Sequence, residues 1–212
     1  MAELIVRLST GEEYTAALGR GLAELLAPGD VVGLSGELGA GKTTLVRAIA
    51  AGLGVDPVLV ASPTYVMVNQ YPVGGAIGQL VHVDAYRMED LEPLGWDRLF
   101  DPVTRMAAGV AVVEWAERIA DALPAETARI GIEAVGARER RISISVPESW
   151  VGRPKFEWLR DREPVACRVT GRWVSPTSPT YPFIDERARE VDMYQWFSGG
   201  YRTSREVRPE EG

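Results

Sequence analysis

The 212-residue sequence has a single cysteine and no long apolar run, and both absences exclude whole classes of protein. Cys167 has no partner within the sequence, so an internal disulfide cannot hold the fold together. No apolar run reaches the roughly 18 residues of a membrane-spanning helix, and the N-terminus lacks the basic and apolar parts of a secretion signal. We therefore expect a cytoplasmic protein without a membrane partner.

The sequence also lacks an excess of positive charge, since 30 acidic side chains outnumber 23 basic ones and the formal net charge is -7. Residues 1–146 contain 12 basic and 19 acidic side chains, whereas residues 147–212 contain 11 of each. A protein that grips nucleic acid broadly needs clustered lysine and arginine against the phosphates. If RNA is involved, we expect a protein partner to hold it.

Lysine is the rarest cation, with 21 arginines against only Lys42 and Lys155. A sequence that uses arginine nearly everywhere else has a lysine inside a glycine-rich segment. A compact ammonium suits a phosphate group at that point. This choice favours a functional reading of the segment around Lys42.

Apolar segments of strand length alternate with helical segments up to about residue 146. We expect strands at 4–8, 31–34, 65–71, 80–83, 110–113, 130–132 and 141–146. We expect helices at about 11–26, from the glycine-rich segment to 53, within 96–106, and at 116–123. Such interleaving predicts an α/β fold of three layers, similar to P-loop NTPases, whose mostly parallel or mixed central sheet is covered on both faces.

The composition of the sequence changes after Pro147, where proline is frequent and apolar residues show little periodicity. We interpret residues 1–146 as the main domain and 147–165 as a linker. Residues 166–212 are expected to form a small, partly disordered appendage.

Gly36 to Thr43 read GELGAGKT, which fits the phosphate-loop pattern between an apolar strand and a helix. Glycines let successive backbone N–H groups face phosphate oxygens at a positive helix N-terminus. Lys42 then reaches the outer phosphates of ATP, and Thr43 offers its hydroxyl to Mg²⁺. The alternative is a glycine-rich turn without a ligand. The expected nucleotide contacts in this segment are Glu37, Gly39, Ala40, Gly41, Lys42, Thr43 and Thr44.

Two acidic residues stand at or near strand ends, where open α/β sheets place their ligands. Glu114 follows the apolar run 110–113 and is a candidate magnesium ligand. Asp84 shares one strand face with His82, and it could orient the attacking water or the metal shell. His82 and Trp115 could each serve the site or the core, and Arg87 could form an ion pair or contact phosphate.

Thr64 belongs to the segment SPTY at residues 62–65. A rigid turn followed by a hydroxyl suits a switch that senses the γ-phosphate and moves on hydrolysis. From spacing alone the segment is only a turn.

Taken in order, several segments resemble the TsaE family, the ATPase of bacterial threonylcarbamoyladenosine biosynthesis. The resemblance covers about residues 4–146. The segments that carry it are GELGAGKTTLVR, SPTY, HVDAYR, GWDRLF and VVEWAER.

The resemblance implies ATP hydrolysis on the TsaB–TsaD complex, which threonylcarbamoylates the adenosine beside the anticodon of ANN-decoding tRNAs. It implies that Lys42 and Thr43 bind phosphate and Mg²⁺, and that Glu114 completes the metal site. It also implies that Asp84 supports hydrolysis, Thr64 belongs to the switch, and Thr10 lies near the base.

Residues 167–201 are similar to the small YacG zinc-finger family of gyrase inhibitors. That family has four cysteine ligands, which fall here at Cys167, Thr170, Ile184 and Ala188. A structural zinc site needs four nitrogen or sulfur ligands, so we predict no zinc. Packing or docking of Phe183, Val191, Trp196 and Tyr201 is expected instead, and residual gyrase binding is an open alternative.

Two other functions fit the phosphate loop. A small-molecule kinase would need a lid with additional cations, but Arg87 is followed by Glu89, Asp90 and Glu92. A module that binds nucleotide without hydrolysing it, with a residual gyrase-binding tail, is the other alternative.

Overall fold

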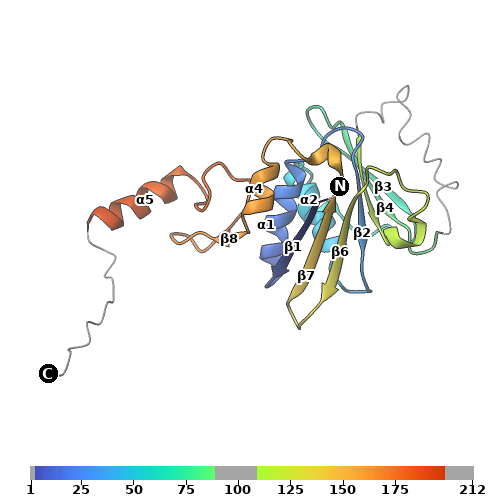
Figure 1. Ribbon diagram of the computed structural model, residues 1–212, viewed down its shortest axis with the longest axis horizontal. Helices are drawn as coiled ribbons and strands as arrows, with labels where there is room; N and C mark the ends of the chain where they lie inside the picture. Colours follow the sequence, from blue (N-terminus) through green and yellow to red (C-terminus); the bar gives the residue numbers. More distant parts are fainter. Residues whose placement is uncertain (1–2, 89–108, 199–212) are drawn as a thin grey trace.

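A seven-stranded sheet forms the centre of the molecule in the computed structural model, which describes residues 3–88 and 109–198 (Figure 1). Its four central strands are parallel, and the pairs at both edges are antiparallel. The prediction of an α/β fold with a mixed central sheet is therefore confirmed. In spatial order the strands are β1 (Glu3–Ser9), β7 (Arg140–Val146), β6 (Ala128–Ala134), β2 (Val31–Ser35), β5 (Gly109–Glu114), β4 (Gln79–Asp84) and β3 (Val68–Pro72).

Helices α1 (Glu12–Ala23) and α2 (Lys42–Gly52) pack closely against each other on one face of the sheet. A Cβ atom added at Gly19 would lie 2.4 Å from the Cβ of Ala48, so only glycine fits there at this helix spacing. Leu18 and Ile49 are fully buried between these helices and inward-facing residues of the sheet, such as Val112.

The opposite face of the central strands carries a second, smaller core. Val31, Val83 and Val113 alternate along their strands with residues of the first core, as the twofold strand repeat requires. Helix η4 (Ala116–Ile119) covers this face together with Leu123.

Three local expectations differ from the structure or lie outside it. The helix expected at 116–123 is a 3-10 helix that ends at Ile119, and Pro124 disfavours the α conformation at the residue before it. The strand expected at 65–71 begins only at Val68, because Met67 adopts a φ of 65° and its N–H closes a turn onto Pro63. The helices expected within 96–106 lie outside the described residues.

Residues 147–165 pack on the main core, although we expected a linker there. After η5 (Glu148–Trp150) comes helix α4 (Phe156–Asp161), and its N-cap Lys155 forms an ion pair with Glu24, the C-cap of α1. Trp150, Phe156 and Leu159 are all buried in the first core. The division of the chain into three parts stays a prediction, and this stretch is attached to the sheet and α1.

Two arginines bind this stretch to β1 and to the turn before β2. Arg7 on β1 donates from Nη2 to the carbonyl oxygens of Leu159, Arg160 and Arg162 at 2.8, 2.6 and 3.2 Å. The guanidinium of Arg153 contacts both carboxylate oxygens of Asp30, at 2.5 and 3.0 Å. Bidentate contacts of this kind are among the stronger charged hydrogen bonds.

The last part of the described chain has a small apolar cluster of its own. It includes residues of the hairpin formed by β8 (Val165–Ala166) and β9 (Trp173–Val174), and Cys167 between these strands packs there with Ile184 and Ala188. Cys167, Ile184 and Ala188, three of the four positions that the resemblance to the zinc-finger family marked, thus pack together. In residues 3–88 and 109–198 no three His, Cys, Asp or Glu side chains form a group that could hold a metal ion.

Helix α5 (Glu186–Phe197) extends away from the sheet (Figure 1). Of the packing or docking expected in this part, Phe183 packs against the small apolar cluster, whereas Trp196 is 66% exposed and packs its ring on Phe197 and not on the main domain. Charged residues occupy most of the first two turns of α5, which leaves it no apolar stripe to bury. Tyr201 lies outside the described residues.

Within the part of the chain that the structure describes, no helix is long and apolar enough to cross a membrane.

Candidate nucleotide and metal site

The glycine-rich loop joins the end of β2 to the start of α2. Gly36, Gly39 and Gly41 have φ angles of 145°, 77° and 110°, a region that strongly favours glycine. A Cβ atom at Gly36 would lie 2.3 Å from the carbonyl oxygen of Ile132, which fixes how closely the loop passes β6.

The first turn of α2 offers backbone N–H groups to an anion. Gly41 is its N-cap and supplies no side-chain hydrogen bond to the helix. The first N–H groups of a helix have no intrahelical acceptor, and the helix dipole adds partial positive charge there. The loop therefore has the conformation and the open donors that a phosphate group needs.

Lys42 is buried and curls over this loop. Its Nζ donates to the carbonyl oxygens of Gly36 and Glu37 at 2.6 and 2.9 Å. The same Nζ lies 3.5 Å from the ring centroid of Trp115, which places Trp115 at the site. Burial lowers the pKa of Lys42, and the negative charges of Glu114, Glu117 and Asp84 oppose that shift.

Glu114 is the centre of a buried polar cluster. Thr43 Oγ1 donates to its two carboxylate oxygens at 2.9 and 3.0 Å. His82 Nε2 lies 2.9 Å from Oε1, and because an ionised carboxylate can only accept, we infer that Nε2–H donates. His82 is fully buried and Glu114 is 3% exposed, whereas Thr43 is only partly buried, so the cluster is open to solvent on the side of α2 or of the loop before it.

The register of the parallel strands brings Asp84 beside Glu114. Asp84 on β4 pairs with Glu114 on β5, both at the carboxyl ends of their strands. Asp84 Oδ2 accepts from Ser62 and Thr64, both at 2.7 Å, and its Oδ1 accepts from the N–H of Tyr86. The segment that contains Thr64 is therefore tied to the strand end that carries Asp84.

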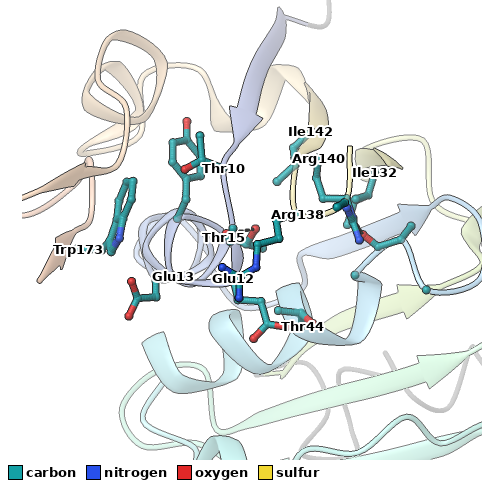
Figure 2. A pocket seen from close by; sticks show the side chains of 16 residues that line it. Thr10, Glu12, Glu13, Thr15, Thr44, Ile132, Arg138, Arg140, Ile142 and Trp173 are labelled. Atoms are coloured by element: carbon teal, nitrogen blue, oxygen red, sulfur yellow. Dashed lines mark hydrogen bonds between the residues drawn. The ribbon is translucent and has the colours of Figure 1, made fainter. Parts of the chain in front are cut away.

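A cavity of about 510 Å³ opens on the α1 side of the loop (Figure 2). Its volume lies within the usual range of small-molecule sites. The residues that line it come from the turn before α1 and its first helical turn, the loop and first turn of α2, the two strands β6 and β7 with their connection, and β9. They are Thr10, Gly11, Glu12, Glu13, Tyr14, Thr15, Gly39, Ala40, Gly41, Thr44, Ile132, Ala137, Arg138, Arg140, Ile142 and Trp173.

The predicted site residues thus divide into two connected groups. Thr10, Gly39, Ala40, Gly41 and Thr44 line the cavity. On the other side of the loop, Thr43, Glu114, Asp84 and Thr64 form the polar clusters described above, beside Lys42. Glu37 contributes its carbonyl oxygen to Lys42.

Sequence reasoning missed several side chains at this site. Arg140 donates from Nε to the carbonyl oxygen of Ala40 at 2.9 Å and so braces the loop from β7. Ser62 shares Asp84 with Thr64. Trp173 comes from the expected appendage, which was given no role at this site, and no pattern in the sequence pairs it with the loop. Arg87 lies 4.9 Å from the ring centroid of Tyr65, and its two alternatives stay open.

Comparisons with known proteins agree on one family. A family model described as "Threonylcarbamoyl adenosine biosynthesis protein TsaE" matches residues 9–142. The tRNA threonylcarbamoyladenosine biosynthesis protein TsaE of Bacillus subtilis is 42% identical over 134 residues, covering 63% of this chain and 80% of that protein. The protein of the same name from Streptomyces coelicolor is 46% identical over 124 residues, covering 56% and 79%.

Structural similarity points the same way. A crystal structure of Bacillus subtilis YdiB has a TM-score of 0.58 and 32% sequence identity, and the match covers 76% of this chain and 94% of that one. The family match contains the loop, Asp84 and Glu114 but ends before residue 147.

Proposed function

The chain belongs to the TsaE family of tRNA threonylcarbamoyladenosine biosynthesis proteins, and from this premise we propose that it is an ATPase that binds and hydrolyses Mg·ATP. Hydrolysis supports the TsaB–TsaD complex as it attaches the N6-threonylcarbamoyl group to the adenosine beside the anticodon of ANN-decoding tRNAs. The chain reaches tRNA only through that complex, in the cytoplasm, as the acidic composition and the sequence led us to expect.

One observation carries the proposal. Thr43, the first hydroxyl after Lys42, contacts the buried carboxylate of Glu114 at the open N-terminus of α2. A phosphate loop beside a strand-end acid is the arrangement that P-loop NTPases use for nucleotide and metal.

The loop binds the phosphates in this proposal. The N–H groups at the start of α2 donate to the phosphate oxygens, and Lys42 exchanges its contacts with the carbonyls of Gly36 and Glu37 for contacts with the outer phosphates. The indole of Trp115 stays against the ammonium and limits its freedom. This preorganises the cation for its anion.

Oxygen donors fit a magnesium site at the same place. The hydroxyl of Thr43 and the carboxylate of Glu114 are hard ligands of the kind that Mg²⁺ prefers, and their mutual hydrogen bond shows that they reach one point. When bound, Mg²⁺ neutralises charge on the β- and γ-phosphates. His82 orients Glu114 from behind.

Asp84 orients the attacking water in the proposed reaction. Its carboxylate holds Ser62 and Thr64 at hydrogen-bond distance, so the same group links the water to the segment expected to act as a switch. A change at the γ-phosphate that draws either hydroxyl away would release the segment from β4.

The test measures ATP hydrolysis with and without a purified TsaB–TsaD pair and tRNA, and follows modified adenosine in the same tubes. Turnover that depends on the pair, with several rounds of tRNA modification, supports the proposal. Hydrolysis indifferent to the pair, without modification, would replace it with a small-molecule kinase. ATP binding without turnover under any condition would favour the non-hydrolysing module.

Variants assign the roles within that assay. Lys42→Ala should abolish tight ATP binding, whereas Glu114→Ala should keep part of the binding and lose hydrolysis. The other lysine offers a matched control, because Lys155 lies far along the chain and pairs with Glu24 on the surface. Lys155→Ala should behave like the parent, and parent-like hydrolysis by Lys42→Ala would contradict the site assignment.

A further inference from the structure

All but one of the residues that line the cavity lie within the family match at 9–142. The exception is Trp173 on β9. It lies in the described part of the chain after the main domain, residues 147–198, which we call the C-terminal segment. The cavity therefore has one wall that the chain adds from outside the part it shares with the family model.

Trp173 is held firmly at this wall. Its ring packs edge-on against Tyr14 of α1, with 5.5 Å between centroids. Its carbonyl oxygen accepts from Arg20 Nη2 at 3.3 Å, and Ala166 pairs with it across the β8–β9 hairpin. A Cβ atom at Gly21 would lie 3.0 Å from Ser175 Oγ, so the chain after Trp173 also lies directly on α1. The indole is only partly buried, which leaves part of its surface to the cavity.

The cavity reaches from the phosphate loop to this indole. Figure 2 shows Trp173 at one side of the lining side chains and Arg140 at the other, with Thr44 between them in the view. The N–H donors of the loop take the phosphates at their end. A nucleotide anchored there must place its base in the remaining space, and an indole offers a flat apolar surface on which any base can stack.

We propose that Trp173 contacts the nucleobase, so that the C-terminal segment completes the nucleotide site. This inference rests on the proposed function, because it takes the phosphate end from the loop. The partner chemistry is an aromatic base joined to a triphosphate, and the triphosphate alone does not need Trp173.

The experiment compares the affinities of the full-length chain for Mg·ATP and for Mg·tripolyphosphate, measured by isothermal titration calorimetry. Trp173→Leu keeps apolar packing against Tyr14 and removes the aromatic surface, and Trp173→Phe restores a smaller one. Trp158→Leu is the matched control, because Trp158 lies in the same segment but packs on Arg162 and does not line the cavity. Thermal unfolding of each variant verifies that it is folded.

We expect Trp173→Leu to weaken ATP binding about tenfold, the scale of one base–aromatic contact, with tripolyphosphate binding unchanged. Trp173→Phe should recover most of the loss, and Trp158→Leu should match the parent for both ligands. Unchanged ATP affinity in Trp173→Leu overturns the inference. An equal loss for both ligands also overturns it, since Trp173 would then act only by packing on α1.

Failure of the proposed function would look different. If Lys42→Ala bound ATP and tripolyphosphate as the parent does, the phosphate site itself would be wrong, whatever Trp173 does. If the parent bound ATP and tripolyphosphate equally well, the phosphate site would be supported and the contact between Trp173 and the base would be contradicted.

Discussion

Glu114 is held on two sides by side chains from other elements. Thr43 approaches from α2 and His82 from β4, and both bond the same buried carboxylate. A carboxylate fixed in this way would lose little freedom on binding the proposed metal ion, so we propose that the hydrogen bond from His82 positions Glu114, a role that the sequence left open.

Replacing His82 tests that role. His82→Leu removes the donor and should raise the Mg²⁺ concentration for half-maximal ATP hydrolysis about tenfold, the usual scale for a metal ligand's hydrogen-bond partner. Magnesium-free ATP binding should stay unchanged. His82→Gln retains a donor and should recover part of the loss. If both variants had the parent's magnesium dependence, His82 would be a core residue only.

Tyr14 predicts a pH dependence of stability. Burial, and then the charge of Glu163, raises the pKa of Tyr14 to about 12. In the unfolded chain the phenol of Tyr14 ionises near pH 10. The contribution of the neutral phenol to the free energy of unfolding is therefore complete below pH 10 and is lost as the pH rises toward 12. Urea unfolding at pH 9 and pH 11 should show a smaller loss for Tyr14→Phe than for the parent, by about 1 kcal/mol. Tyr65→Phe, at an 84% exposed position, should lose as much as the parent.

Among residues, those that the sequence revealed share a local signature. Lys42 and Thr43 belong to a loop motif, and Asp84 and Glu114 stand at the ends of apolar strands. These local patterns were enough to select all four residues as candidates for one site. Arg140 contacts Ala40 across 100 positions of sequence, and Trp173 reaches the cavity through a hairpin that has no signal of its own. Contacts of this kind depend on tertiary packing, which periodicity does not encode.

At the scale of elements, the close pairing of α1 and α2 positions the loop. Gly19 faces Ala48, and Gly52 faces Ala23, where an added Cβ atom would lie 2.5 Å away. Small residues at both contact points let the backbones of α1 and α2 approach closely. This contact fixes α2 and the loop before it relative to the residues of α1 that line the cavity.

A single methyl group tests this spacing. Gly19→Ala should lower the free energy of unfolding by about 1–2 kcal/mol, because the overpacking at Ala48 outweighs the better helix propensity of alanine. Ala48→Gly in the same chain removes the facing methyl group and should restore part of the loss. Chemical denaturation measures both. A Gly19→Ala variant more stable than the parent would show that the helices separate without cost.

The elements that were predicted well are those with a strong repeat. Strands at 31–34 and 110–113 are apolar throughout because both faces of the sheet are covered, and they were placed within a residue or two. The stretch 147–165 was not recognised as part of the fold. Its prolines suggested a linker, yet Trp150, Phe156 and Leu159 are buried, and only their contacts with β1 and α1 show why.

At the scale of the whole molecule, the C-terminal segment packs on the same layer of helices that supports the site. Arg7 bonds the end of α4, Arg153 bonds Asp30 before β2, and Trp173 lies on α1. These contacts join residues more than 120 positions apart in the sequence. We therefore expect the segment to unfold together with the sheet in one cooperative transition.

Truncation tests this cooperativity. A chain that ends at residue 146 loses Trp150, Phe156 and Leu159 from the core, and burial of one such side chain alone contributes about 2–5 kcal/mol. Since small domains are stable by about 5–15 kcal/mol in total, this chain should be largely unfolded or aggregated at 25 °C. A chain that ends at residue 163 keeps α4 and the contacts of Arg7, so it should be folded at 25 °C and melt at a lower temperature than the full-length chain. Equal melting temperatures for all three chains would contradict the shared core and favour the division that the sequence predicted, with a linker at 147–165 and a small appendage at 166–212.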